Sequence, residues 1–128
     1  MLDRALAHQR AGRPKEAEAA YRKVLARKPR HDRALFMLSG LLFEAGRFEE
    51  TSRYLEDLIE VAPHPAYLTN LAEAYRRQGQ LDAAAAACAR ALAADPDLPE
   101  AHHNLGLTLM NGGAPARALP ELERAVEL

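Results

Sequence analysis

The residues with the clearest capacity for chemistry are five histidines and one cysteine, because imidazole and thiolate groups bind metals and take part in catalysis. No two of the histidines stand four residues apart, the spacing that places a zinc-binding pair on one helix face. Cys88 is the single cysteine, so it forms no internal disulfide and is expected to be a buried, inert thiol. We therefore expect no catalytic residue, cofactor or metal; the histidines are His8, His31, His64, His102 and His103.

Two asparagines, Asn70 and Asn104, lie 34 residues apart. A primary amide is both a donor and an acceptor, so it can pair with a peptide backbone whatever the peptide's side chains are. A ladder of such amides would hold an extended chain with little sequence preference. The alternative is that these asparagines serve packing and solubility alone, and the sequence leaves both interpretations open.

The interval between the two asparagines recurs along the whole chain. Glycines are separated by 34, 33 and 34 residues, at Gly12, Gly46, Gly79 and Gly113. Prolines are separated by 34 and 33 residues, at Pro29, Pro63 and Pro96. Such a period indicates one structural unit that is stacked about four times. Alanine and leucine dominate the composition while β-branched residues are few, which favours helices over strands.

The third unit shows the content of the repeat most clearly. Its first helix has an apolar face at three- and four-residue steps, and Gly79 is suited to end that helix in a left-handed conformation. Asp82 then stands where a carboxylate suits the start of the next helix. The apolar residues of the unit are Leu68, Leu71, Ala72, Tyr75, Leu81, Ala84, Cys88, Ala91 and Leu92.

This pattern resembles the tetratricopeptide repeat, a 34-residue helix–turn–helix unit with small residues, an aromatic, a glycine and a terminal proline at set places. The resemblance implies an all-α superhelix, or solenoid, of about four stacked hairpins in a single domain over residues 1–128. The units are approximately 1–31, 32–64, 65–98 and 99–128, the first and last incomplete. Because Pro120 lacks an amide hydrogen and crowds the preceding turn, we expect the last helix to start late or to bend.

In tetratricopeptide arrays the binding surface is the concave groove, which the first helix of each hairpin lines. The resemblance therefore implies a protein-interaction module that binds a peptide or partner segment there. Mapping those helix faces onto this sequence gives the groove residues Phe36, Met37, Phe43, Asn70, Glu73, Arg76, Arg77, His103, Asn104 and Asn111. Arg76 and Arg77 with His103 also form a weaker candidate for a phosphate or carboxylate site.

The strings Asn70-Leu71-Ala72 and Asn104-Leu105-Gly106 resemble repeats in the arms of O-linked N-acetylglucosamine transferases, which carry an asparagine ladder. The ladder is incomplete here, since Met37 and Asp3 stand at the same place in the earlier units. The clamp of Lys, Asn and Arg by which co-chaperone repeats grip chaperone tails is absent. An alternative function follows from the resemblance: this chain would be the N-terminal recognition arm of a larger bacterial glycosyltransferase or sulfotransferase.

Charge is unevenly distributed although the formal net charge is only −1. Residues 1–33 contain ten Lys or Arg against four Asp or Glu, whereas the chain after His64 contains five against eight. A basic first unit suits an acidic partner, or the charges simply keep the outer helix faces solvated. The scattered basic residues and few aromatics argue against nucleic acid, and no apolar run at the start of the chain suggests a signal or membrane anchor.

Both ends of the array lack the polar capping helix that solenoids usually need. We expect either that the chain is a piece of a longer array or that it self-associates through its uncapped ends. A lone cysteine suits the reducing cytoplasm, and the alanine- and arginine-rich composition suits a bacterial source.

Overall fold

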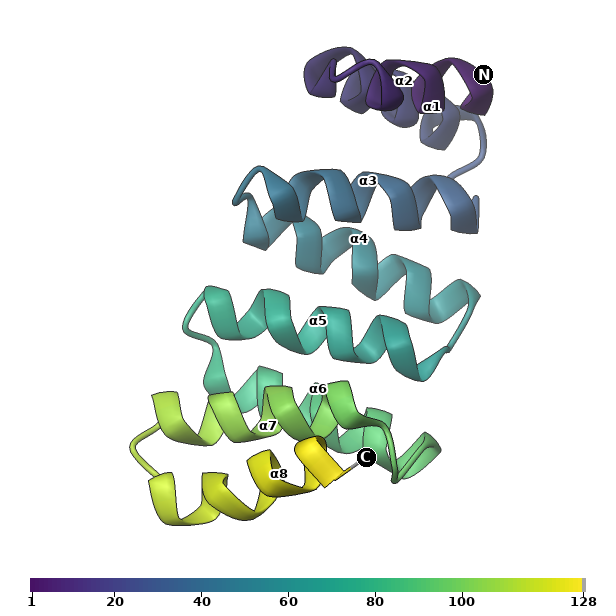
Figure 1. The fold of residues 1–128 in the computed structure, drawn as a ribbon. Helices are drawn as coiled ribbons and strands as arrows, with labels where there is room; N and C mark the ends of the chain where they lie inside the picture. The colour runs from purple at the N-terminus through teal and green to yellow at the C-terminus, as the bar shows by residue number, and fades with distance from the viewer. Residues whose placement is uncertain (128) are drawn as a thin grey trace. The chain divides into compact units, whose positions relative to one another are not determined.

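The structure, a computed structural model, describes residues 1–127, which form eight α-helices and no strand (Figure 1). Short turns join the helices in pairs, so the described chain consists of four helical hairpins. The all-α repeat architecture predicted from the sequence is confirmed. The hairpins are α1 (Leu2–Arg10) with α2 (Pro14–Arg27), α3 (Asp32–Glu44) with α4 (Phe48–Val61), α5 (Pro65–Arg77) with α6 (Leu81–Ala94), and α7 (Pro99–Asn111) with α8 (Pro115–Glu127).

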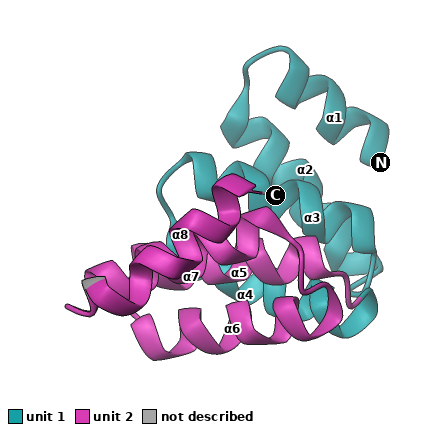
Figure 2. Ribbon diagram, turned by 60° about the horizontal axis from the view of Figure 1, so that its bottom comes forward, with its two compact units in different colours: residues 1–62 teal, residues 63–128 magenta. Residues whose placement is uncertain are grey.

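The hairpins fall into two compact units of two hairpins each, shown in different colours in Figure 2. Unit 1 contains Met1–Ala62, and within it α2 packs against α3. Unit 2 begins at Pro63; within it α6 packs against α7, and the first helices of the two hairpins, α5 and α7, also touch. The expectation of a single domain remains a prediction.

Each hairpin turns at one of the periodic glycines, and all four have a positive φ between 72° and 77°. At the third turn the Gly79 N–H donates to the Arg76 carbonyl over 3.0 Å, and the Gln80 N–H donates to the Tyr75 carbonyl over 2.9 Å. These two bonds form a Schellman motif, in which a left-handed residue satisfies the last carbonyls of a helix. The left-handed cap predicted at Gly79 is confirmed.

The two units have cores of different composition. In unit 1, Tyr21 is fully buried and its hydroxyl donates to the Gln9 side chain, so the second helix is tied to the first. Leu38 and Leu42 of α3 pack into the same buried cluster. Unit 2 is built mainly on alanines, which allow its helices to approach closely; its fully buried residues include Ala72, Ala74, Ala84, Cys88, Ala91, Ala101 and Ala118.

The last described helix differs from our expectation. We expected Pro120 to make this helix start late or bend, but α8 does not start late: it begins at Pro115, two residues after its glycine, as α2, α4 and α6 do after theirs. The late start was wrong because Pro120 is the sixth residue of the helix, where its missing N–H removes one interior bond while leaving the first turn unaffected. A bend at Pro120 stays a prediction. None of the helices in residues 1–127 combines the length and apolarity needed to span a bilayer.

Candidate functional site

The first helix of the second hairpin carries the candidate residues of unit 1. On α3, Phe36 is 39% exposed, Gly40 is exposed, and Phe43 is half-buried. Steps of four and three residues place them along one helix face. A Cβ built on Gly40 would meet no atom within 4 Å, so the helix backbone there is open to contact. Phe36, Gly40 and Phe43 form what we call the α3 surface.

Two aromatic rings shape one end of the α3 surface. Phe43 meets Phe48, the first residue of α4, in an edge-to-face arrangement with ring centroids 5.2 Å apart. This geometry is favourable for aromatic pairs and fixes the Phe43 ring. Met37, also predicted to line the groove, is half-buried and packs against the core cluster of unit 1. The structure therefore gives Met37 a packing role in unit 1.

In unit 2 the candidate residues lie on α5 and α7. Asn70 and Arg77 are exposed on α5, whereas Glu73 and Arg76 are half-buried. Glu73 accepts from Arg76 Nη2 over 2.6 Å and from Arg77 Nε over 2.9 Å, so one carboxylate pairs with both guanidinium groups. Burial works to raise the pKa of Glu73, but the hydrogen bonds from the two arginines outweigh it and hold the pKa below its usual value.

The Glu73 pairing bears on the candidate anion site. Two guanidinium groups and one carboxylate leave a net positive charge, and Glu73 orients both arginines along α5. His103, the third predicted member, is exposed on α7. The structure thus assembles Glu73, Arg76 and Arg77 into one group on α5.

Asn104 makes a specific contact between the two first helices of unit 2. Its amide Nδ2 donates to the backbone carbonyl of Thr69 on α5 over 3.0 Å. Thr69 is itself buried, and its hydroxyl donates to the Ala66 carbonyl over 2.7 Å. The bond uses one of the two donors of the Asn104 amide. Asn104 therefore ties α7 to α5, and this bond holds its amide in a defined direction.

Asn111, the last predicted groove residue, is exposed at the end of α7. We refer to Asn70, His103, Asn104, Asn111 and the Glu73 group as the α5–α7 surface. The described structure holds the α3 surface within unit 1 and the α5–α7 surface within unit 2.

The sequence did not reveal the role of His102. Its ring nitrogens lie 2.7 Å from Glu121 Oε2 on α8 and 2.7 Å from the Pro96 carbonyl in the α6–α7 turn. Burial alone would lower the pKa of His102, but the hydrogen bond to Glu121 and that to Pro96 raise it. Because Leu35 and Leu68 occupy the same place in earlier repeats, periodicity indicated only a packing residue.

The remaining chemical candidates are structural. Cys88 is fully buried; burial, followed by the negative charges of Glu121 and Glu73, raises the pKa of its thiol to about 11. His31 and His64 cap α3 and α5, each accepting a backbone N–H at Nδ1 over 3.1 Å. Across residues 1–127, no group of three or more His, Cys, Asp or Glu side chains is arranged to hold a metal ion.

Comparison with known families agrees with the hairpin geometry. The family profile described as "Tetratricopeptide repeat" matches residues 8–75, more than half of the sequence. The chain belongs to the tetratricopeptide repeat family. A second profile, "TPR repeat", matches residues 72–113. Membership of this family supports a role as a protein-interaction module. No characterised protein matched the chain in a sequence comparison.

Solved structures show the same fold at low sequence identity. A crystal structure of MamA superposes with a TM-score of 0.90 at 22% identity, covering 96% of this chain and 72% of MamA. MamA 41-end from Desulfovibrio magneticus RS-1 superposes with a TM-score of 0.89 at 23% identity, and the match covers 99% of this chain and 72% of the MamA chain. YrrB, a tetratricopeptide protein with an unusual peptide-binding site, superposes with a TM-score of 0.87 at 21% identity. This match covers 96% of the present chain and 64% of YrrB.

Proposed function

We propose that this protein is a protein-interaction module that holds a segment of a partner protein on the first helices of its hairpins. The observation that carries the proposal is the exposed aromatic ring of Phe36 beside the open backbone at Gly40. Large apolar side chains are normally buried, and an exposed ring next to a bare stretch of helix gives a partner's side chain both a contact surface and room. The α3 surface is therefore the apolar anchor point.

The α5–α7 surface supplies the polar part of the proposal. Exposed Asn70 stands next to Thr69, the residue whose carbonyl fixes the Asn104 amide. An amide that is already oriented loses less side-chain entropy when it binds, so a partner's backbone can pair with it at lower cost. Asn70 and Asn104 are thus the pair that would give binding with little sequence preference, in the manner of the ladders in O-linked N-acetylglucosamine transferase arms.

A random 12-residue peptide library displayed on phage, selected on the immobilised chain, tests the proposal. Calorimetry then measures the affinity of the selected peptide for wild type, Phe36→Ser and Asn70→Ala. We expect Phe36→Ser to weaken binding by about tenfold, because aromatic anchors dominate such interfaces, and Asn70→Ala to weaken it by a smaller factor. Asn70 is the better of the two amides to vary, because Asn104→Ala would also disturb the contact between α5 and α7.

The matched control is Arg53→Ala, an exposed residue on the second helix of the same hairpin as Phe36. Its affinity for the peptide should equal that of the wild type. The proposal fails if the library yields no peptide, or if the selected peptide binds Phe36→Ser and Asn70→Ala as tightly as it binds the wild type.

A further inference from the structure

A cleft of about 450 Å³ lies against the first hairpin of unit 1 and is not part of either candidate surface. Its apolar part consists of Met1, which is 56% exposed, and the small side chains of Ala19 and Ala20. Because alanine side chains are short, they leave space over α2 into which a longer apolar side chain fits. Polar residues complete the lining: Arg4, His8, Glu16 and Lys23.

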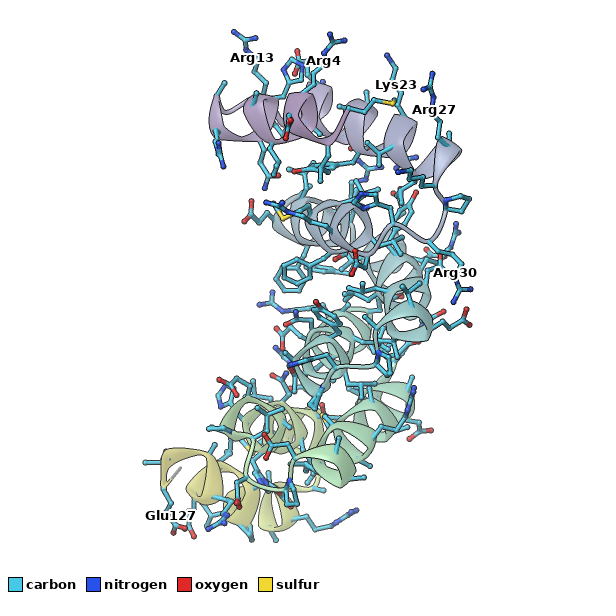
Figure 3. All side chains as sticks on the ribbon, turned by 90° about the vertical axis from the view of Figure 1, so that its right-hand side faces the viewer. Arg4, Arg13, Lys23, Arg27, Arg30 and Glu127 are labelled. Carbon is cyan, nitrogen blue, oxygen red and sulfur yellow. The ribbon has the colours of Figure 1, made fainter. Side chains whose placement is uncertain are left out.

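The surroundings of this cleft are strongly basic. Figure 3 shows Arg4, Arg13, Lys23 and Arg27 projecting from the same end of unit 1, all from the first hairpin and its turn. Within residues 1–127, none of these four side chains forms an ion pair. We call the cleft and these cations the N-terminal basic face. A ligand that fits it carries both apolar side chains and negative charge.

Helix α8 carries that combination of residues. Leu119 is 57% exposed and Val126 is 88% exposed, although large aliphatic side chains are usually covered. Glu123 is exposed between them, at the four- and three-residue steps that place all three on one helix face. A second hollow, of about 400 Å³, is lined by Leu122, Glu123, Val126 and Glu127. We call these residues the α8 face.

The acidic groups of the α8 face are available for new contacts. Glu123 forms no ion pair among the described residues, and Glu127 pairs only with Arg124, at 3.6 Å. Both side chains of this pair are solvent-exposed, so it contributes little stability. Figure 3 shows Glu127 pointing outward from the end of α8.

We propose that the α8 face of one copy of this chain binds the N-terminal basic face of a second copy. Leu119 and Val126 would cover the apolar floor formed by Ala19 and Ala20, while Glu123 and Glu127 would meet Arg4 and Lys23. Apolar burial supplies most of the affinity in such an interface, and opposite charges supply orientation and a fast encounter. Each copy offers one face of each kind, so the contact joins two different surfaces and can be repeated from copy to copy.

The chemistry of the cleft favours this occupant over nucleic acid. Single-stranded nucleic acids are held by basic side chains together with aromatic rings on which bases stack. The residues that line the cleft include no Phe, Tyr or Trp side chain and one carboxylate, Glu16, that would repel a phosphate. Met1, Ala19 and Ala20 offer apolar surface that a phosphate backbone would not use. This inference does not depend on peptide binding at the α3 and α5–α7 surfaces.

Sedimentation equilibrium of the full chain, from about 5 to about 500 µM, tests the proposal. The wild-type mass should rise with concentration above the 14.1 kDa of one chain. Arg4→Glu with Lys23→Glu places like charges opposite each other, as does Glu123→Lys with Glu127→Lys. We expect each double variant alone to associate about tenfold or more weakly than the wild type. An equal mixture of the two should recover association, because each altered face then meets its complement.

Arg53→Glu with Arg90→Glu is the matched control for Arg4→Glu with Lys23→Glu, since both arginines are exposed, lie outside the two faces and lower the net charge by the same amount. This control should associate as the wild type does. Phe36→Ser should also associate normally, which separates failure here from failure of the peptide proposal. A wild-type mass of 14.1 kDa at every concentration overturns the inference, as does equal weakening by the control or no recovery in the mixture.

Discussion

A Cβ atom added to Gly106 would lie 2.6 Å from Cδ2 of Leu122, closer than such atoms can approach. Gly106 is a buried residue in the interior of α7, and Leu122 is on α8, so this glycine sets the approach of the two helices of the last hairpin. Leu122 is itself part of the α8 face. The position of that surface therefore depends on a residue that belongs to neither proposed interface.

Gly106→Ala should destabilise the protein. Overpacking in a tightly packed contact costs about 1–3 kcal/mol, which exceeds the gain of about 1 kcal/mol from replacing glycine by alanine within a helix. The midpoint of urea unfolding should fall. Gly40→Ala is the matched comparison, because that glycine is also inside a helix but a Cβ there meets open space, and its midpoint should rise. A higher midpoint for Gly106→Ala would show that Leu122 moves aside freely.

Gly79→Val tests the strain of a left-handed residue without any clash. The φ of Gly79 is +76°, and a Cβ there meets nothing within 4 Å, so the cost arises from the backbone alone. We expect a loss of about 1–3 kcal/mol in the free energy of unfolding. Gly79→Asn should lose less, because asparagine tolerates this conformation better. Thermal unfolding of both variants measures the difference, and equal melting temperatures for Val and Asn would contradict it.

The turns and helices of this protein were predictable because they depend on local spacing. Gly79, Asp82 and Pro96 are within one repeat, and each acts on the backbone beside it. The roles of Asn104 and His102 were not predictable, since Asn104 bonds to a carbonyl 35 residues away and His102 to a carboxylate 19 residues away. Whether a side chain reaches such a partner depends on helix packing, which periodicity alone does not determine. The sequence therefore identified Asn104 as a candidate binding residue but did not reveal its contact with Thr69.

Asn104 and Asn70 should differ in their effect on stability. Asn104→Ala removes a half-buried hydrogen bond between α7 and α5, which is worth about 0.5–1.5 kcal/mol. Asn70→Ala changes an exposed side chain, so its effect should remain within about 0.5 kcal/mol. Urea unfolding followed by circular dichroism compares them. If the two variants are equally stable, the bond to the Thr69 carbonyl contributes nothing in solution.

Cys88 should be unreactive in the native protein. Its thiol is fully buried and has a pKa of about 11, so little thiolate is present at neutral pH and the sulfur is shielded from reagents. A disulfide reagent such as Ellman's should therefore label the native protein slowly and the urea-unfolded protein at once. The less stable Gly106→Ala variant should be labelled faster than the wild type. Complete labelling of the native wild type on mixing would show that α6 opens readily.

The pairing of His102 with Glu121 should make stability depend on pH. The folded pKa of His102 is raised above its ordinary value of 6.5, because the ring donates to Glu121 and to the Pro96 carbonyl. A group with a raised folded pKa contributes stability that is fully present below the unfolded pKa and is lost as pH rises through the folded pKa. The contribution should therefore be complete below pH 6.5 and should be lost gradually as the pH rises from 6.5 through the higher folded pKa.

Glu121→Gln is the variant that isolates this contribution, because it removes the negative charge while keeping an acceptor oxygen. The other four histidines are unchanged in it, so the difference in unfolding free energy between wild type and variant reports the pair. That difference should be largest near about pH 5.5 and should shrink towards about pH 8.5. An NMR titration of the His102 ring should also give a lower pKa in Glu121→Gln than in the wild type. Identical ring titrations would mean that the carboxylate does not pair with His102 in solution, and the attachment of α8 to the α6–α7 turn would then rest on packing and on the ion pair between Arg124 and Asp97.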